Sequence, residues 1–81
     1  VHKVKKGMAE AIEIIVDSSY QKLKGKIISD LKLDENITIP ALKRDKDVLM
    51  VHGNTKIHDE DHLIVFYKDK DVIDNFYNTF R

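Results

Sequence analysis

The residues of this chain that could do chemistry are concentrated at positions 57–66, IHDEDHLIVF. On a helix, His58 and His62 would present both imidazoles on one side, as a zinc site requires. However, the run after His62 is rich in β-branched and aromatic residues, which predicts a strand. On a strand the two rings share a face but stand about 13 Å apart. We therefore interpret the acids as a solvated turn and predict no metal site, with His58 and His62 as the residues to test as ligands.

No other segment has the pattern of a catalytic site. Ser18, Ser19 and Ser29 lie outside any G-x-S-x-G context, and the chain has no cysteine. Its three glycines are isolated, so neither a dinucleotide fingerprint nor a phosphate-binding P-loop is present. A chain of 81 residues also has little room for a water-excluding pocket. We predict that the chain is not an enzyme and has no catalytic residues.

Length and charge narrow the class of protein further. With 81 residues the chain is one small domain, and its free energy of unfolding should be low. Its 14 basic and 14 acidic residues argue against a nucleic-acid partner. No apolar run is long enough to insert into a membrane, and no signal peptide is visible. Small domains without disulfides often associate, so we expect a homodimer. Because the chain begins at Val1, we expect it to be a piece of a longer protein, with residues 1–9 an arm from a preceding, absent domain. We also expect the protein to be cytoplasmic, since no signal peptide or membrane-spanning run is visible.

The apolar pattern predicts the elements of the first half. Ile12, Ile14 and Val16 recur at a period of two and so fall on one face, which predicts a strand at 11–16. Apolar residues recur every four positions at 23, 27 and 31, and we expect a short helix over 25–31. Residues 37–44 are a second predicted strand. Because Pro40 cannot donate to a ladder, this strand should be at an edge or bulged there.

The second half is predicted to form turns and strands followed by a helix. We expect strands at 48–52 and 62–67, brief pairing at 55–57, and turns between them. The strand at 62–67 is apolar on both faces. Asp69 can cap a helix over 70–80, whose Phe76, Tyr77 and Phe80 should face the core. The class is therefore α+β, a small antiparallel or mixed sheet with two helices in the order β-α-β-β-β-α, forming one domain over 10–81.

Four motifs in this order resemble a known family. They are Gly25–Lys26 with Leu31, then Arg44, then Gly53–Asn54–Thr55, and finally Asp61 with Leu63–Ile64–Val65–Phe66. The pattern resembles the TrkA C-terminal type of regulator-of-potassium-conductance domain (RCK_C). The leading VHKVKKGMAEAIE resembles the segment that enters the second such lobe in peripheral subunits of Trk-type potassium uptake systems.

The resemblance implies a non-catalytic regulatory domain at the inner face of the cell membrane. It implies a homodimer or higher homo-oligomer docked on a membrane potassium-transport subunit. NAD(H) or ATP would bind in the preceding Rossmann lobe, so we expect no cofactor within these residues. The alternative is a ligand-sensing RCK_C domain of another cation channel or antiporter, which would bind a cyclic dinucleotide, a nucleotide or a cation at its dimer interface.

The resemblance also singles out candidate ligand residues. Relatives that bind cyclic di-AMP use an Asn followed by two aliphatic residues, with an Arg six positions earlier. Asn36 and Ile37 fit this pattern, whereas Thr38 and Asp30 depart from it. Asn36, Ile37 and Arg44 are thus the candidate residues of a ligand or dimer interface. Glu60 stands where the family has Gly, and a positive φ there would cost about 1 kcal/mol.

Overall fold

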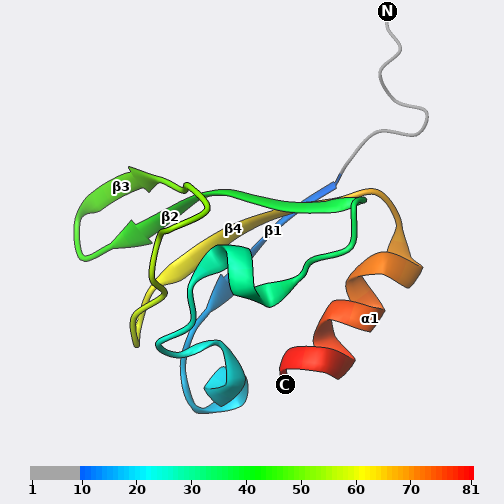
Figure 1. Cartoon of the computed structure of the whole chain (residues 1–81), viewed down its shortest axis with the longest axis horizontal. Helices are drawn as coiled ribbons and strands as arrows, with labels where there is room; N and C mark the ends of the chain where they lie inside the picture. Colours follow the sequence, from blue (N-terminus) through cyan, green and yellow to red (C-terminus); the bar gives the residue numbers. More distant parts are fainter. Residues whose placement is uncertain (1–9) are drawn as a thin grey trace, which may run out of the picture.

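A computed structural model describes residues 10–81 as a four-stranded sheet covered on one side (Figure 1). The strands are β1 (Glu10–Ile15), β2 (Ile37–Arg44), β3 (Asp47–Met50) and β4 (His62–Tyr67). All neighbours are antiparallel, in the order β1-β4-β2-β3. The predicted α+β class is confirmed, and each predicted strand is found within two residues of its expected ends. The predicted arm at residues 1–9 lies outside the described residues.

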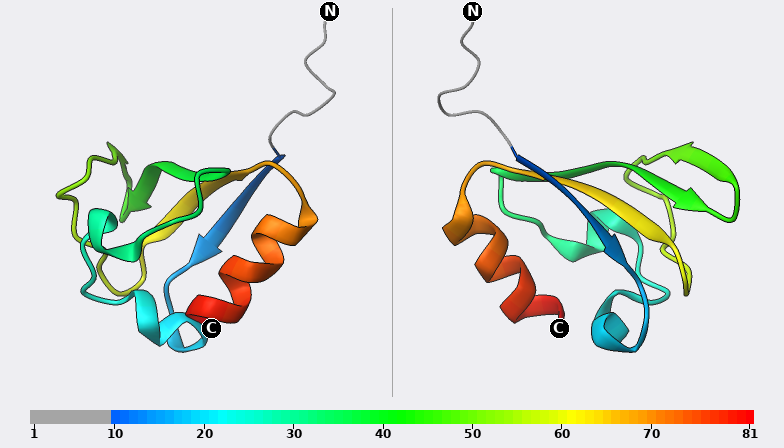
Figure 2. Two further views of the ribbon diagram at one scale, coloured as in Figure 1. Left: turned by 45° about the vertical axis from the view of Figure 1, so that its right-hand side comes forward. Right: turned by 180° about the vertical axis from the view of Figure 1, so that it is seen from behind.

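Helical segments lie together on one face of the sheet. They are α1 (Lys70–Phe80) and two 3-10 segments, η1 (Ser18–Leu23) and η2 (Ile28–Leu31) (Figure 2). The N-cap of helix α1 is Asp69, whose side chain accepts a hydrogen bond from Val72 N, as predicted from the sequence. Within residues 10–81, no helix has the length and apolarity that crossing a bilayer requires.

The predicted helix over 25–31 is found only over Ile28–Leu31, as a 3-10 segment, and residues 25–27 are not helical. Residues 18–23 and 28–31 form separate 3-10 turns, and Gly25 between them has a φ of 75°. Ile27 pairs with Lys56 in an isolated bridge, which confirms the brief pairing expected near 55–57. Leu23 and Leu31 are both buried, but they reach the core from different turns. The four-residue spacing therefore arises without a continuous α-helix.

Pro40 lies within β2, an interior strand between β4 and β3. The pairing of β2 with β4 shifts register between Thr38 and Ala41, which brackets the proline. The bulge expected at Pro40 is therefore confirmed, and the edge position is not. A bulge releases one residue from the ladder, so it accommodates a residue without an N–H donor.

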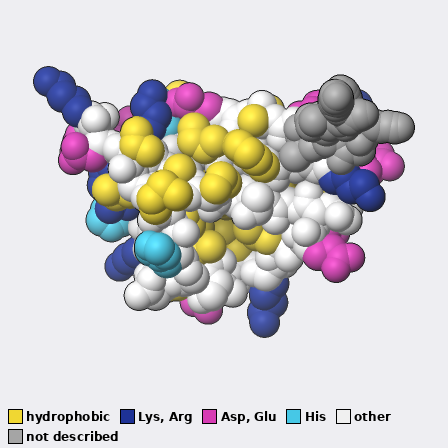
Figure 3. Space-filling model, turned by 90° about the horizontal axis from the view of Figure 1, so that it is seen from above, with side chains coloured by type: hydrophobic (Ala, Val, Ile, Leu, Met, Phe, Trp, Pro, Cys, Tyr) yellow, Lys and Arg dark blue, Asp and Glu magenta, His cyan; other side chains and the backbone are white. Residues whose placement is uncertain are grey.

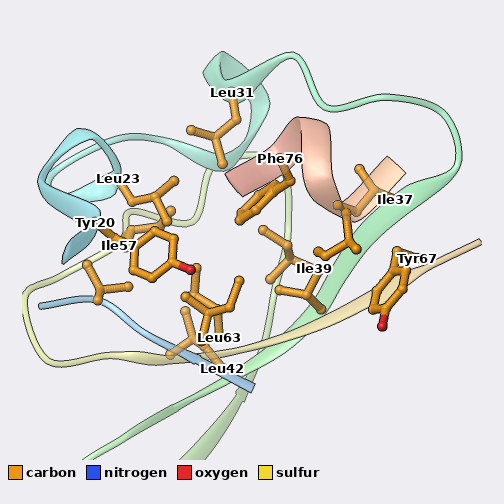
Figure 4. Packing of buried hydrophobic residues seen from close by; sticks show 14 residues of the cluster. Tyr20, Leu23, Leu31, Ile37, Ile39, Leu42, Ile57, Leu63, Tyr67 and Phe76 are labelled. Atoms are coloured by element: carbon orange, nitrogen blue, oxygen red, sulfur yellow. The ribbon is translucent and has the colours of Figure 1, made fainter. Parts of the chain in front are cut away.

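The core lies between the sheet and its helical cover (Figure 4). Strand β4 contributes Leu63, Val65 and Tyr67, and α1 contributes Ile73 and Phe76. Because side chains alternate along a strand, Ile64 and Phe66 point to the opposite side. Strand β4 is thus apolar on both faces, as expected, and the helical segments cover the face that carries Leu63, Val65 and Tyr67.

Candidate functional site

The turn at 58–61 is built around a buried ion pair. Asp61 is 1% exposed, and its carboxylate accepts Arg44 Nε at 2.9 Å and Arg44 Nη2 at 2.7 Å. The same carboxylate accepts His58 N at 2.8 Å, while Arg44 Nη2 also donates to Lys56 O at 3.0 Å. The fork of Arg44 therefore joins the end of β2 to the segment 56–61. The sequence analysis placed Arg44 and Asp61 in one motif but did not predict that they pair.

Charge and hydrogen bonding set the protonation of this pair. Burial opposes ionisation of Asp61, but the hydrogen bonds from Arg44 and His58 N outweigh it and lower the pKa of Asp61. The Asp61 hydrogen bond raises the pKa of Arg44. Both groups therefore stay charged near neutral pH, and the pair is a structural element with no proton to transfer.

Glu60 adopts the left-handed conformation that its position in the motif suggested. Its φ is 70°, a region that favours glycine. Glu60 N donates to Val16 O and Val16 N donates to Asp61 O, both at 2.8 Å. These bonds hold the turn against the end of β1 although Glu60 replaces the expected glycine.

His58 and His62 have different surroundings. His62 Nδ1 contacts Glu13 Oε2 across the β1–β4 pair, and this hydrogen bond lowers the pKa of Glu13. The exposed His58 contributes its backbone N–H to Asp61. Over residues 10–81, no three His, Asp or Glu side chains come together as ligands for a metal ion. We therefore interpret the turn at 58–61 as a structural element that holds the ends of β1 and β2 in place.

The structure separates Asn36, Ile37 and Arg44. Asn36 is exposed and Ile37 belongs to the core, at the start of β2. Arg44 ends the same strand, roughly 23 Å from Ile37 at the usual rise per residue. Asn36 N donates to Asp34 Oδ1 at 2.8 Å, so it stabilises the turn before β2. Within one copy of the chain these three residues do not form a common site.

Two open hollows lie on the covered side, between α1 and the segment 21–37. The first, of about 320 Å³, is lined by apolar residues that include Leu33, Ile37 and Phe76. The second, of about 620 Å³, is lined by Lys22, Lys24 and Lys26. Asp30 also lines the second hollow, and Lys24 forms an ion pair with Asp59 at 3.0 Å. The sequence analysis did not single out these lysines. Their spacing of two residues was the signal that could have identified them as a group.

The opposite side of the sheet, here called the outer face, is largely apolar, and none of the helical segments described over residues 10–81 lies on it. Strand register assigns to it Ala11, Glu13, Ile15, Thr38, Ala41, Lys43, Val48, Met50, His62, Ile64 and Phe66. Phe66 is 41% exposed, Val48 66% and Met50 68%. Figure 3 looks down on this face and shows apolar side chains gathered over the sheet. A contiguous patch of this kind is typical of an interaction surface.

Curated relatives match this chain over most of its length. The family described as the TrkA-C domain matches residues 11–81. The Trk system potassium uptake protein TrkA of Vibrio alginolyticus is 35% identical over 83 aligned positions, covering 100% of this chain and 18% of that protein. TrkA of Halomonas elongata is 40% identical over 72 positions, covering 86% of this chain and 16% of that protein. The chain thus spans less than a fifth of these relatives.

Solved structures share its fold. The RCK C domain of the potassium transport protein KtrA, in complex with cyclic diadenosine monophosphate, has a TM-score of 0.72 at 24% identity, covering 88% of this chain and 82% of that chain. An RCK domain solved with cda has a TM-score of 0.69 at 20% identity, covering 88% of this chain and 97% of that chain. At these identities the likeness establishes the fold. Since the family match extends from residue 11 to residue 81, the chain belongs to the TrkA-C domain family.

Proposed function

We propose that this chain is a regulatory and self-pairing domain of a Trk-type potassium uptake system, without catalytic activity of its own. The observation that supports this most directly is the family match over residues 11–81, together with relatives that are TrkA proteins. The domain would belong to a cytoplasmic peripheral subunit docked on a membrane transport subunit. NAD(H) or ATP would bind in a lobe that precedes it.

The mechanism we propose is a shift between arrangements of the assembled lobes. Nucleotide binding in the preceding lobe would favour one arrangement, and the paired domains would transmit it to the transport subunit as rigid bodies. The fork of Arg44 on Asp61 and the apolar core support this, because they tie β1, β2 and β4 into one unit. Because a closely packed domain deforms little, a displacement imposed at one end is transmitted to the other end.

A domain exchange tests this function. In a bacterium that lacks its own Trk peripheral subunit, a TrkA relative whose C-terminal domain is replaced by residues 10–81 should restore potassium uptake. The same relative without any C-terminal domain should lose control of uptake while its purified preceding lobe still binds NADH. Equal uptake with and without the domain would contradict the proposal.

A ligand-sensing domain is the alternative function. The observation in its favour is the lysine-lined hollow, which has the volume of a small-molecule site and a positive rim. Asp30 in the same hollow and Thr38 after Ile37 weaken the match to a cyclic dinucleotide site. Calorimetry with cyclic di-AMP, NADH, ATP, Mg²⁺ and Ca²⁺ separates the two functions. Micromolar binding of any of these would favour the sensor, and no heat would favour the assembly domain.

A further inference from the structure

We propose that the free edge of β1 binds an extended segment of a different protein as a fifth strand, and that this segment carries an acidic residue for Arg81. The inference goes beyond the proposed function, because it adds a contact with another protein to the pairing of copies. The site consists of the outward backbone groups of β1 and of a groove between β1 and the C-terminal end of α1.

The backbone of β1 offers hydrogen-bonding groups on the side away from β4. Val16, just after β1, donates its N–H to the segment that leads into β4. Because this direction alternates along an antiparallel strand, Ala11, Glu13 and Ile15 direct their N–H and C=O groups away from the sheet. Within residues 10–81, only Ile15 O among these groups is used, as the acceptor of Asp17 N at 3.0 Å. All three residues are exposed, so their free groups are a template for a further strand.

The two edges of the sheet differ in their protection against such pairing. Strand β3 has four residues and follows a charged turn at 45–47, and short, charged edges discourage further strands. Strand β1 has six residues in unbroken register with β4 and contains neither proline nor lysine. Its Glu10 side chain accepts Tyr67 OH at 3.0 Å, and its Glu13 side chain contacts His62. The edge of β1 is therefore the one open to a partner.

A hollow of about 560 Å³, here called the edge groove, runs beside β1. Residues 12–15 of β1 form one wall, and Tyr20, Tyr77 and Arg81 form the other. Figure 2 shows α1 lying next to β1, with Tyr77 and Arg81 near its C-terminal end. Ala11 and Ile15 are roughly 14 Å apart along the strand, which about five residues of an extended segment would match. Every second side chain of that segment would enter the groove.

Arg81 determines which charge the segment should carry. Its Nε donates to Tyr20 OH at 3.2 Å, and its guanidinium carbon lies 4.3 Å from the centroid of the Tyr77 ring. These contacts hold the guanidinium at the groove, and no Asp or Glu side chain of residues 10–81 forms an ion pair with it. Asp17 also lines the groove, but it is the N-cap of η1. A carboxylate on the segment would accept charge-assisted hydrogen bonds from Arg81.

A different protein suits this edge better than a second copy of β1. An antiparallel pair of β1 strands that used all three free residues would set the two Glu13 side chains directly opposite each other, and like charges so placed are destabilising. The second strand would also present Ile12 and Ile14 to the groove, and neither supplies an acid for Arg81. The expected occupant is thus an acidic segment of β-branched residues from another chain.

A synthetic peptide tests the site directly. The probe is Thr-Val-Thr-Val-Glu-Val-Thr with both ends blocked, and its matched control has Lys in place of Glu. In nuclear magnetic resonance spectra of the ¹⁵N-labelled chain, the Glu peptide should shift the amides of Ala11, Glu13 and Ile15 and slow their exchange with solvent. The Lys peptide should bind roughly fivefold more weakly, since it places two cations together.

Two substitutions in the chain test the two parts of the site. Ala11→Pro removes one outward N–H and leaves the ladder with β4 intact, so it should weaken peptide binding about fivefold. Ala11→Val keeps the N–H and is the matched control, with affinity unchanged. Arg81→Gln should weaken binding of the Glu peptide roughly fivefold but leave unchanged the affinity for a peptide with Gln in place of Glu.

Several results would overturn the inference without touching the proposed regulatory function. They are no amide shift at millimolar peptide, shifts confined to other parts of the chain, and equal affinity for the Glu and Lys peptides. Slow exchange of the three amides in the free chain would show that the edge is already covered. Protection that is lost on dilution would then identify a second copy as the occupant. If Ala11→Pro does not fold, the comparison of Arg81→Gln with the Glu and Gln peptides still decides.

Discussion

Arg44 and Asp61 connect parts of the chain that are far apart in sequence. Arg44 ends β2, and Asp61 leads into β4 while its carboxylate fixes the His58 backbone. A guanidinium donates from two nitrogens in a fixed fork, which an ammonium cannot reproduce. Both oxygens of the carboxylate are therefore used, and removal of either partner leaves buried polar groups unsatisfied.

Arg44→Ala should lower the free energy of unfolding by about 3 kcal/mol, because it leaves the Asp61 carboxylate buried without its cation. Arg44→Lys should recover part of this loss, since it restores charge but not the second hydrogen bond. Urea unfolding followed by circular dichroism measures both variants. Equal midpoints for wild type and Arg44→Ala would show that the pair contributes nothing.

Stability should fall in acid because of Asp61. Its pKa is lower in the folded chain, so the unfolded chain binds a proton first as the pH decreases. The contribution is fully present above the unfolded value of about 3.9 and is lost as the pH falls through the folded value. Glu13, whose pKa is also lowered, acts in the same direction. Asp61→Asn should be less stable near neutral pH and show a shallower loss in acid, as measured by urea unfolding across this range.

Glu60 is strained by its backbone conformation, and Glu60→Gly should raise the free energy of unfolding by about 0.5–1 kcal/mol. Asp59→Gly is the control in the same turn, because Asp59 lacks a positive φ and pairs with Lys24. It should destabilise the chain. Thermal melting of the two variants shows whether each substitution raises or lowers the stability of the chain. Destabilisation by Glu60→Gly would show that another interaction of Glu60 outweighs the strain.

At the scale of elements, the strand at 11–16 was predicted from apolar residues at a period of two, and the strand at 62–67 from a continuous run rich in β-branched and aromatic residues. The helix over 25–31 could not be predicted correctly from its spacing. Its apolar residues are buried by two 3-10 turns and a bridge to Lys56, and these depend on the position of a segment more than twenty residues later. The glycine at position 25 was the local signal in the sequence, because glycine favours the left-handed conformation that Gly25 adopts and that interrupts a continuous helix.

The stability of helix α1 should depend on its N-cap residue, Asp69. Asp69 Oδ1 accepts Val72 N at 3.1 Å, so Asp69→Ala should cost about 1 kcal/mol of stability. Asp69→Ser keeps a capping oxygen and should cost less. Urea midpoints of the two variants provide the comparison, and identical midpoints would show that packing of Ile73 and Phe76 alone holds the helix.

At the scale of the whole molecule, the sequence predicted alternation within a strand but not which side chains of different strands share a face. Val48 and Met50 became part of the outer face through pairing with β2, and Phe66 through the register of β4. The contact of Arg44 with Asp61 likewise depends on which strands lie together. Pairing between distant strands is set by the assembled sheet, so local spacing could not reveal either feature.

The melting temperature should rise with protein concentration, because a dimer stabilises the folded chain by mass action. Calorimetry of the wild type from micromolar to millimolar concentration measures this dependence. A constant melting temperature for the wild type would mean that the folded state gains nothing from self-association.

The pairing of β1 with β4 bears on how the chain is made. Glu10 and Tyr67 lie side by side in the sheet although 57 positions separate them. During translation β1 leaves the ribosome before β4, and the strand that it pairs with is complete only when the chain through Tyr67 has followed. Sheets closed by such distant contacts assemble slowly and leave apolar strands open to aggregation. Chaperone demand during synthesis should therefore be set by the time that β1 waits for β4.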